Sequence, residues 1–344
     1  MRVTINDIAR ATGYSKTTVS FAFNDPTRIS ETAREKVLKA AHELGYVPDP
    51  VARSLSSRRH GTIGILLPQP IPLALKNPYM VRLISGLGEV CNREGLSLTM
   101  LPPTRGNLLN SVKSAAVDGF VTIGLHPETE IVQVIRNRHI PFVTVDGESD
   151  DGGPCVRVND REASRIAMAH LLEHGHRHIG VVIMSGERLP DQEEYSATGR
   201  ERLAGYEDAL RQQGIEWADP AIVKIHAQCS LDGGQTAGAE ILSKHPEVTG
   251  VVAMSDILAI GIVLQVVKSG KRVPWDISVV GFDDIPEASF LSPALTTVWQ
   301  PAEDKGLRAG ELLVKMINNK TVEQRVEFRC RLVQRESVAD VKPA

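Results

Sequence analysis

The stretch that most constrains the fold is residues 4–24, TINDIARATGYSKTTVSFAFN, which predict two short helices joined by a tight turn. Thr4 followed by Asp7 has the pattern of a capping box at the start of the first helix, and Gly13 ends that helix. Ser15 can cap the second helix. Apolar spacing gives the two helices inward faces made of Ile5, Ile8, Ala9, Thr12, Val19, Ala22 and Phe23.

The start of the second helix carries short polar side chains on its outward face. These residues are Lys16, Thr17, Thr18 and Ser20, and Phe21 follows them. In a helix-turn-helix unit, this end of the second helix meets base edges, and hydroxyl side chains there bond phosphates or bases. Taken alone, the pattern also fits an ordinary helical hairpin at the rim of a larger domain.

The next residues extend this unit. Ser30 begins a third amphipathic helix, which Gly45 ends. The three helices are expected to share a core of Ile8, Val19, Val37, Ala41 and Leu44. Asp49 and Pro50 can then start a short helix over residues 51–57, which is too short to remain helical alone in water.

Residues 4–59 resemble the lactose-repressor (LacI/GalR) family of bacterial transcription regulators. The motifs that carry the resemblance are T-I-x-D-I-A, S-K-T-T-V-S, S-E-T-A-R-E-K-V and G-Y-x-P-x-x-x-A-R-S-L. It implies a homodimer on a palindromic DNA operator, with second helices in two major grooves and paired hinge helices in the minor groove between them. The implied domains are a helix-turn-helix domain (1–48), a hinge helix and linker (49–60), and a two-lobed ligand-binding and dimerisation domain (61–344).

The resemblance also assigns roles to individual residues of the N-terminal part, residues 1–60, which is called the head below. Lys16 and Thr17 would read bases, while Ala52 and Leu55 would enter the minor groove. The residues expected to hold the DNA backbone are Thr4, Ser15, Thr18, Ser20, Asn24, Arg28 and Ser30.

Two positions of the head depart from the family pattern. Phe21 stands where many members carry an arginine that reads guanine, and Tyr14 replaces a small valine at the turn. Because Phe21 can offer only apolar contact, such as with a thymine methyl group, we expect the operator to differ from the commonest one.

Positive charge is concentrated in the head. Residues 1–60 contain ten Lys and Arg against six Asp and Glu, whereas the rest of the chain contains 29 against 36. The head is therefore near +4 and the rest near -7, although the whole chain carries only -3. This distribution localises attraction to DNA in the head.

Several classes of protein are disfavoured. Four cysteines lie far apart, as expected of reduced thiols in a cytoplasmic protein: Cys91, Cys155, Cys229 and Cys330. No segment has the pattern of a signal peptide or a membrane span. The histidines at 174, 176 and 178 are expected to cap a helix and turn rather than bind a metal. No cofactor is expected, and no catalytic set is recognisable.

After Gly61, short apolar strands alternate with amphipathic helices, which is typical of parallel sheets. One series runs over residues 62–147, and the same rhythm restarts at Cys155 and continues to Asp284. The fold class is therefore a small all-α helix-turn-helix head plus an α/β effector domain of two doubly wound parallel-sheet lobes. The tail after residue 294 is too short for a third unit and is expected to pair with these sheets.

The effector part also resembles the same family and, more distantly, periplasmic sugar-binding proteins. The matching segments are NPYMVRLISGL, HLLEHGHRHIG, RLAGYEDAL, AMSDILAIG and ISVVGFDD. They imply two lobes joined by three crossovers, with a small ligand in the cleft near the carboxyl ends of the strands. Matched by position, the ligand-binding residues are Asp146, Arg202, Ser255 and Asp283, with Tyr79, Gln228 and Trp299 as weaker candidates.

The chemistry of these side chains suits a sugar or another polyol, because charged groups bond hydroxyls and aromatic faces pack against sugar rings. Asp146 and Asp283 can instead cap helices or bridge the lobes. Ser255 stands where an asparagine is frequent, so the identity of the ligand stays open.

No apolar heptads follow Val338, so a dimer is expected rather than a coiled-coil tetramer. Two classes of function remain. The first is a DNA-binding repressor controlled by a small effector. The second is a cytoplasmic sugar-binding or α/β enzymatic protein whose helical head serves another partner, and an enzyme would need a catalytic set.

Overall fold

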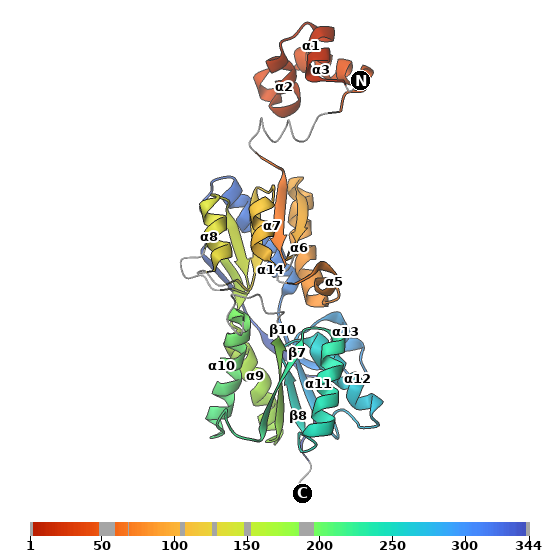
Figure 1. Cartoon of the computed structure of the whole chain (residues 1–344), viewed down its shortest axis with the longest axis vertical. Coiled ribbons are helices and arrows are strands. Elements are labelled where there is room, and N and C mark those ends of the chain that lie inside the picture. Colours follow the sequence, from red (N-terminus) through yellow and green to blue (C-terminus); the bar gives the residue numbers. More distant parts are fainter. Residues whose placement is uncertain are drawn as a thin grey trace. The chain divides into compact units, whose positions relative to one another are not determined.

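The computed structural model describes residues 3–47, 59–67, 69–103, 107–125, 129–147, 153–185 and 196–341. The chain divides into two compact units, residues 1–61 and 62–344, which are the head and the effector unit (Figure 1). The hinge helix predicted over residues 51–57 lies outside the described residues.

The head consists of short helices. These are α1 (Ile5–Thr12), α2 (Lys16–Asn24), the 3-10 turn η1 (Pro26–Arg28) and α3 (Glu31–Glu43). The predicted caps are present: the Asp7 carboxylate accepts from the Thr4 backbone amide at 2.9 Å. The Ser15 hydroxyl likewise accepts from the Thr18 amide at 3.1 Å. The sequence did not predict η1.

One small core holds the three α-helices of the head together. It is formed by Ile8, Val19, Ala22, Val37 and Ala41. The prediction that Leu44 belongs to this core is wrong, because α3 ends before Leu44 and Leu44 is 40% exposed. Gly45 reverses the chain in a left-handed conformation (φ 66°), and Tyr46 packs against the core instead.

The effector unit contains two six-stranded sheets. The first is parallel, in the order β11 (Arg325–Phe328), β5 (Cys155–Val158), β4 (Phe142–Val145), β3 (Gly119–Ile123), β1 (Thr62–Leu66) and β2 (Ser97–Leu101). The second has the order β12 (Arg331–Val333), β10 (Thr296–Trp299), β9 (Ser278–Asp283), β8 (Gly250–Ala253), β6 (Ile179–Ser185) and β7 (Ile222–Gln228). In this second sheet β12 runs antiparallel to β10.

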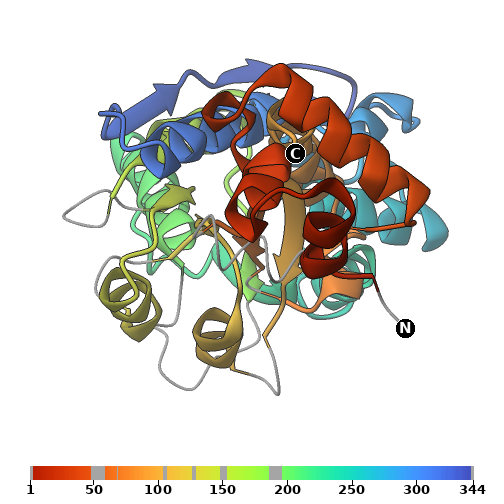
Figure 2. The same cartoon turned by 90° about the horizontal axis from the view of Figure 1, so that it is seen from above.

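Helices cover both faces of each sheet. The first lobe contains α5 (Ile71–Ala74), α6 (Pro78–Glu94), α7 (Leu108–Ser114), α8 (Glu130–Asn137) and α14 (Ala302–Ile317). The second contains α9 (Asp160–Glu173), α10 (Ala197–Gln212), α11 (Leu231–Lys244), α12 (Asp256–Lys268) and α13 (Pro286–Phe290). Seen from above, α7 and α8 lie on one side of the first sheet and α14 on the other (Figure 2). The sequence analysis missed α5, α8 and α13.

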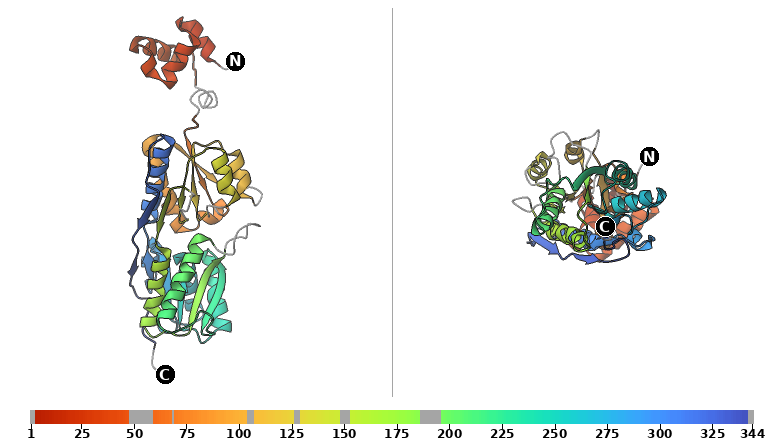
Figure 3. Two further views of the ribbon diagram at one scale, coloured as in Figure 1. Left: turned by 90° about the vertical axis from the view of Figure 1, so that its left-hand side faces the viewer. Right: turned by 90° about the horizontal axis from the view of Figure 1, so that it is seen from below.

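The prediction that the second lobe begins at Cys155 is wrong. Cys155 pairs with Thr144 of β4 and with Arg325 of β11, so β5 belongs to the first sheet. The chain then crosses between lobes three times: after β5, between β10 and α14, and between β11 and β12. The C-terminal segment accordingly runs along both lobes, which confirms that the tail pairs with the existing sheets (Figure 3).

Helices α6 and α14 pack with almost no space between their backbones. A β-carbon on Gly86 would lie 2.0 Å from the Glu303 carbonyl oxygen, and one on Gly306 would lie 2.0 Å from the Leu83 carbonyl oxygen. Only glycine fits at such distances. This contact fixes the first turn of α14, and with it the position of Lys305.

We expect Gly306→Ala to lower the free energy of unfolding of the effector unit by about 2 to 3 kcal/mol, because the added methyl group must push the two helices apart. Gly88→Ala is the matched control on α6, where an added β-carbon meets nothing within 4 Å. The control should be neutral or stabilising by about 0.5 to 1 kcal/mol. Urea unfolding followed by circular dichroism measures both, and equal losses would contradict the packing argument.

Candidate functional site

The N-terminal end of α2 is the candidate DNA-reading surface. Lys16 and Thr17 are exposed there, and no hydrogen bond or ion pair joins their side chains to other described residues. The Ser15 hydroxyl is held in place by the Thr18 amide and lies 2.8 Å from the Thr18 hydroxyl. The backbone of this turn is thereby fixed while the predicted base readers remain available for contact.

The other predicted backbone contacts lie close to helix starts or on α2. Thr4 and Ser30 are the N-cap residues of α1 and α3, and the Ser30 hydroxyl accepts from Ala33 at 3.3 Å. The Asn24 amide donates to the Ser20 hydroxyl at 3.2 Å. A helix N-terminus favours phosphate, because its N–H groups and dipole both attract anions.

The two departures from the family pattern are each covered by a cation. Arg28 lies over the ring of Phe21 at 5.2 Å from the centroid and also pairs with Asp25 at 2.8 Å. Lys36 lies 5.3 Å from the centroid of the Tyr14 ring. Ala52 and Leu55, the predicted minor-groove residues, lie outside the described residues.

In the effector unit, two predicted ligand residues stand at the carboxyl ends of strands. Asp146 follows β4 and Asp283 ends β9, and both have positive φ, 54° and 130°. Non-glycine residues avoid such conformations unless the surrounding structure imposes them, as happens most often at functional sites. Both are almost fully buried, with exposures of 8% and 5%.

A chain of hydrogen bonds joins these two aspartates. The Tyr79 hydroxyl donates to one oxygen of Asp146, and the ammonium group of Lys305 donates to the other at 2.6 Å. Lys305 also donates to the Gln300 side-chain oxygen at 2.6 Å. The Gln300 amide then donates to Asp283 at 2.5 Å. These five residues are called the relay below.

The relay spans the two lobes. Tyr79, Asp146 and Lys305 belong to the first lobe, Asp283 belongs to the second, and Gln300 lies in the crossover between β10 and α14. Two direct contacts also join the lobes beside it. The Thr198 hydroxyl donates to the Asp146 carbonyl at 2.9 Å, and the Asn77 amide lies 3.7 Å from the Cys229 sulfur.

Arg202 lies beside the relay in the second lobe. Its Nε donates to Asp160 at 2.9 Å, and its Nη1 donates to the Met254 carbonyl. The guanidinium carbon lies 3.6 Å from the centroid of the Phe282 ring, immediately before Asp283. Arg202 is therefore both a candidate ligand contact and part of the lobe's own structure.

The remaining predicted ligand residues are less closely gathered. Ser255 is buried at the N-cap of α12, 3.4 Å from the Cys229 sulfur. Trp299 is half-buried and stacks with Arg331 at 4.1 Å. Gln228 is exposed at the end of β7. The structure thus groups Tyr79, Asp146 and Asp283 through the relay, whereas it shows no bond from Gln228 or Trp299 to that group among the described residues.

Sequence reasoning missed Lys305 and Gln300. Lys305 follows two acidic residues in an amphipathic helix, which is the usual pattern of an exposed lysine, yet it is fully buried. Gln300 directly follows the candidate Trp299 at a strand end. Its position at the carboxyl end of a strand could have identified Gln300, because open α/β sheets bind ligands there. No comparable sequence signal identifies Lys305.

Asp256, also missed, is a buried acid beside the relay. Thr297 donates to one of its oxygens at 2.5 Å, and the Ile285 amide donates to the other at 2.9 Å. Burial, and then the neighbouring Asp283 carboxylate, raise the pKa of Asp256 to about 8. Burial also raises the pKa of Asp283, to about 6, although Arg202 opposes the rise.

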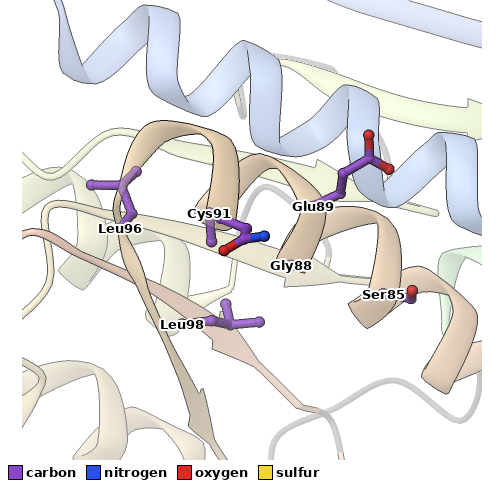
Figure 4. A pocket seen from close by; sticks show the side chains of 7 residues that line it. Ser85, Gly88, Glu89, Cys91, Leu96 and Leu98 are labelled. Atoms are coloured by element: carbon purple, nitrogen blue, oxygen red, sulfur yellow. The ribbon is translucent and has the colours of Figure 1, made fainter.

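Two surface hollows lie away from these residues. One is lined by Ser85, Gly88, Glu89, Cys91 and Asn92 of α6 and by Leu96 and Leu98 beside it (Figure 4). The other lies between the C-terminal ends of α6 and α14. Neither includes a residue of the relay, so the candidate effector site rests on the strand-end side chains.

Other sequence expectations concern histidines and membranes. His174 is the C-cap residue of α9, while His176 bonds Thr249 at 2.9 Å and the Ala339 carbonyl at 3.2 Å. The described residues contain no group of three or more His, Cys, Asp or Glu side chains arranged to hold a metal. Within the same residues, no helix has the length and apolar content needed to cross a bilayer.

The helical head with its exposed α2 start, and a two-lobed α/β unit with polar strand ends, define a ligand-responsive DNA-binding protein. A family model for bacterial regulatory proteins of the lacI family matches residues 4–49. A model for a periplasmic binding protein-like domain matches residues 168–338.

Relatives and a solved structure extend the match to almost the whole chain. The HTH-type transcriptional regulator IpsA of Corynebacterium glutamicum is 33% identical over 98% of each chain. The ribose operon repressor of Halalkalibacterium halodurans is 31% identical over 97% of this chain and 96% of its own. The complex of the transcriptional regulator CelR with cellobiose has a TM-score of 0.69 and 28% identity, covering 98% of this chain and 100% of that chain. The chain belongs to the LacI family of bacterial transcriptional regulators, and its relatives are named as regulators rather than enzymes.

The raised pKa of Asp256 predicts a pH dependence of stability. Because its folded pKa, about 8, lies above the ordinary aspartate value of 3.8, its contribution to stability is complete below about pH 4 and is lost as pH rises through about 8. We therefore expect the free energy of unfolding of the effector unit to fall by roughly 1 kcal/mol per pH unit between pH 6 and 8 from this group. Asp256→Asn should remove that share of the slope.

Asp276→Asn is the matched control, because Asp276 is an aspartate whose pKa is lowered by hydrogen bonds from Arg272. Its titration lies in the acid range, so it should leave the slope between pH 6 and 8 unchanged. Urea titrations at pH 6, 7 and 8 provide the comparison. An Asp256→Asn slope equal to that of the unsubstituted protein would refute the assignment of a neutral Asp256.

Proposed function

We propose that this regulator is a repressor that binds a palindromic operator as a homodimer and releases or takes up DNA in response to a sugar or sugar derivative. The observation that carries the DNA-binding part is the fixed turn before α2, which leaves Lys16 and Thr17 exposed at the helix start. The protein acts by binding rather than catalysis, in the cytoplasm and on the nucleoid when operator is bound.

In this proposal Lys16 and Thr17 read bases, and Phe21 makes an apolar contact, for example with a thymine methyl group. Arg28 lies over the Phe21 ring and supports its orientation. The backbone contacts are Thr4, Ser15, Thr18, Ser20, Asn24, Arg28 and Ser30. Three of these are helix N-caps, where backbone N–H groups face an approaching phosphate.

The hinge, residues 49–60, couples the two units in the proposal. Its helix would fold only when two copies meet on DNA, with Ala52 and Leu55 in the minor groove. Ordering the hinge costs about 1 to 2 kcal/mol per residue, which contacts with the partner hinge and the DNA must offset. A change in lobe angle that separates the hinges can therefore alter operator affinity.

The effector would bind at the strand ends, where Asp146, Arg202, Ser255 and Asp283 are buried and polar. Tyr79 lies next to Asp146, whereas Gln228 and Trp299 would form outer walls. A sugar is supported by the chemistry of these side chains and by two similar proteins, the regulator CelR with its cellobiose and the ribose operon repressor.

Selection of operator from random duplexes, followed by footprinting, tests the proposal. We expect a pseudo-palindromic site protected by two copies of the chain, with affinity falling on the order of a thousandfold between about 50 and 200 mM salt. A sugar that changes the melting temperature should also change operator affinity. Protection of a single asymmetric half-site by one copy would contradict the dimer.

Asp283→Asn separates the two parts of this function. It should abolish the response of operator binding to the sugar while keeping operator affinity within about threefold, because the head is a separate unit. Asp276→Asn, which replaces an aspartate paired with Arg272, should keep both properties. Arg202→Ala is a poorer test, because it would leave the buried Asp160 without its ion-pair partner. Loss of operator binding in a folded Asp283→Asn protein would count against the effector site.

A further inference from the structure

Lys305 is a buried cation of the effector unit. Its side chain is fully buried, with 0% exposure, and it bonds Asp146 and Gln300 at 2.6 Å each. Its ammonium group also lies 4.9 Å from the centroid of the Tyr79 ring. A buried ammonium group is stable only when such partners replace its lost water, so Asp146 and Lys305 form one electrically neutral unit.

The other acidic side chains near the strand ends also have partners within the protein. Asp160 pairs with Arg202 at 2.9 Å, and Asp284 pairs with Arg335 at 2.6 Å. Asp256 accepts from the Thr297 hydroxyl and from the Ile285 amide. Asp283 accepts from the amide of Gln300, which leaves it as the acid best placed to accept a hydroxyl.

This pairing restricts the charge of the ligand. At Asp146, a ligand ammonium group would be a second cation where Lys305 is already bonded. Burial raises the pKa of Asp283, but the charges of Arg202 and Lys305 also act on Asp283 and oppose that rise, so the same two cations disfavour a third one there. A ligand with a carboxylate would find both buried cations, Lys305 and Arg202, already paired. An uncharged ligand with several hydroxyl groups meets neither penalty, because it needs only donors and acceptors.

We infer that Lys305 is a specificity-determining residue that favours uncharged polyols over amino sugars by occupying Asp146, the acidic side chain that an ammonium group would otherwise use. This inference rests on the proposed effector site and names the ligand class of that site. Lys305 acts by setting the charge of the site, and it stays bonded to Asp146 while hydroxyls of the ligand bind around that pair.

The test compares neutral sugars with charged analogues of the same ring, using full-length protein without DNA. The probes are glucose, galactose and ribose; glucosamine and galactosamine; and glucuronate and galacturonate. Isothermal calorimetry gives the ratio of affinities. The unsubstituted protein should bind a neutral sugar at least tenfold more tightly than its amino and acid analogues.

Two substitutions should change that ratio in opposite directions. Lys305→Met, of similar length but uncharged, leaves the Asp146 carboxylate bonded only to Tyr79. The affinity for the amino analogue should therefore rise at least tenfold relative to that for the neutral sugar. Asp146→Asn leaves Lys305 without a counter-charge, so the affinity for the acid analogue should rise instead, relative to that for the neutral sugar. If Lys305→Met does not fold, Asp146→Asn still decides. Lys315→Met is the control, because Lys315 is exposed on the same helix and should keep the ratio.

Unchanged ratios in the folded variants would overturn the inference, because a purely structural Lys305 would alter stability without altering the preference between neutral and charged rings. Preference of the unsubstituted protein for an amino or acid sugar would overturn it as well. Either result leaves the proposed function standing if a sugar still changes operator affinity. If no probe binds, both this inference and the proposal that the effector is a sugar would be overturned.

Discussion

The buried ion pair between Lys305 and Asp146 is the interaction on which the architecture of the effector unit most depends. Its two members lie 159 residues apart in the sequence, and they meet because the chain returns from the second lobe to build α14 in the first. The close approach of α14 to α6, which requires Gly86 and Gly306, places Lys305 at the strand ends. Separating the pair would leave a buried charge unpaired, so the pair, Gln300 and Asp283 tie the lobes together across the crossover.

The head could be predicted from the sequence almost completely, because its determinants are local. Thr4 with Asp7, and Ser15 with Thr18, are capping pairs three residues apart, and the inward faces follow helical spacing. The expectation for Leu44 fails because Leu44 is the C-cap residue of α3, where the helical spacing no longer applies. In the effector unit the sequence predicted the alternation of strands and helices except for α5, α8 and α13. The predicted boundary at Cys155 is wrong, because β5 pairs with β11, a strand that follows the entire second lobe.

The candidate site could be predicted only where its residues follow from the local sequence. Asp146 and Asp283 stand directly after apolar strands, where open α/β sheets place their ligands, so position alone identifies them. Nothing in the local sequence distinguishes Lys305 from an exposed helical lysine, since its burial depends on tertiary packing against α6. The structure therefore places the positive charge of Lys305 in the site, where it pairs with Asp146. Arg202, which was predicted to contact the ligand, pairs with Asp160.

Side-chain ¹⁵N NMR of the full-length protein tests most directly whether the Lys305 ammonium group is buried and held by Asp146 and Gln300. Ammonium protons of exposed lysines exchange rapidly with water, whereas those of a buried ammonium group that donates two hydrogen bonds exchange slowly. We expect a persistent lysine ammonium signal at neutral pH that disappears in Lys305→Met and remains in Lys315→Met. A spectrum with no such signal would show that Asp146 and Gln300 do not hold the Lys305 ammonium group.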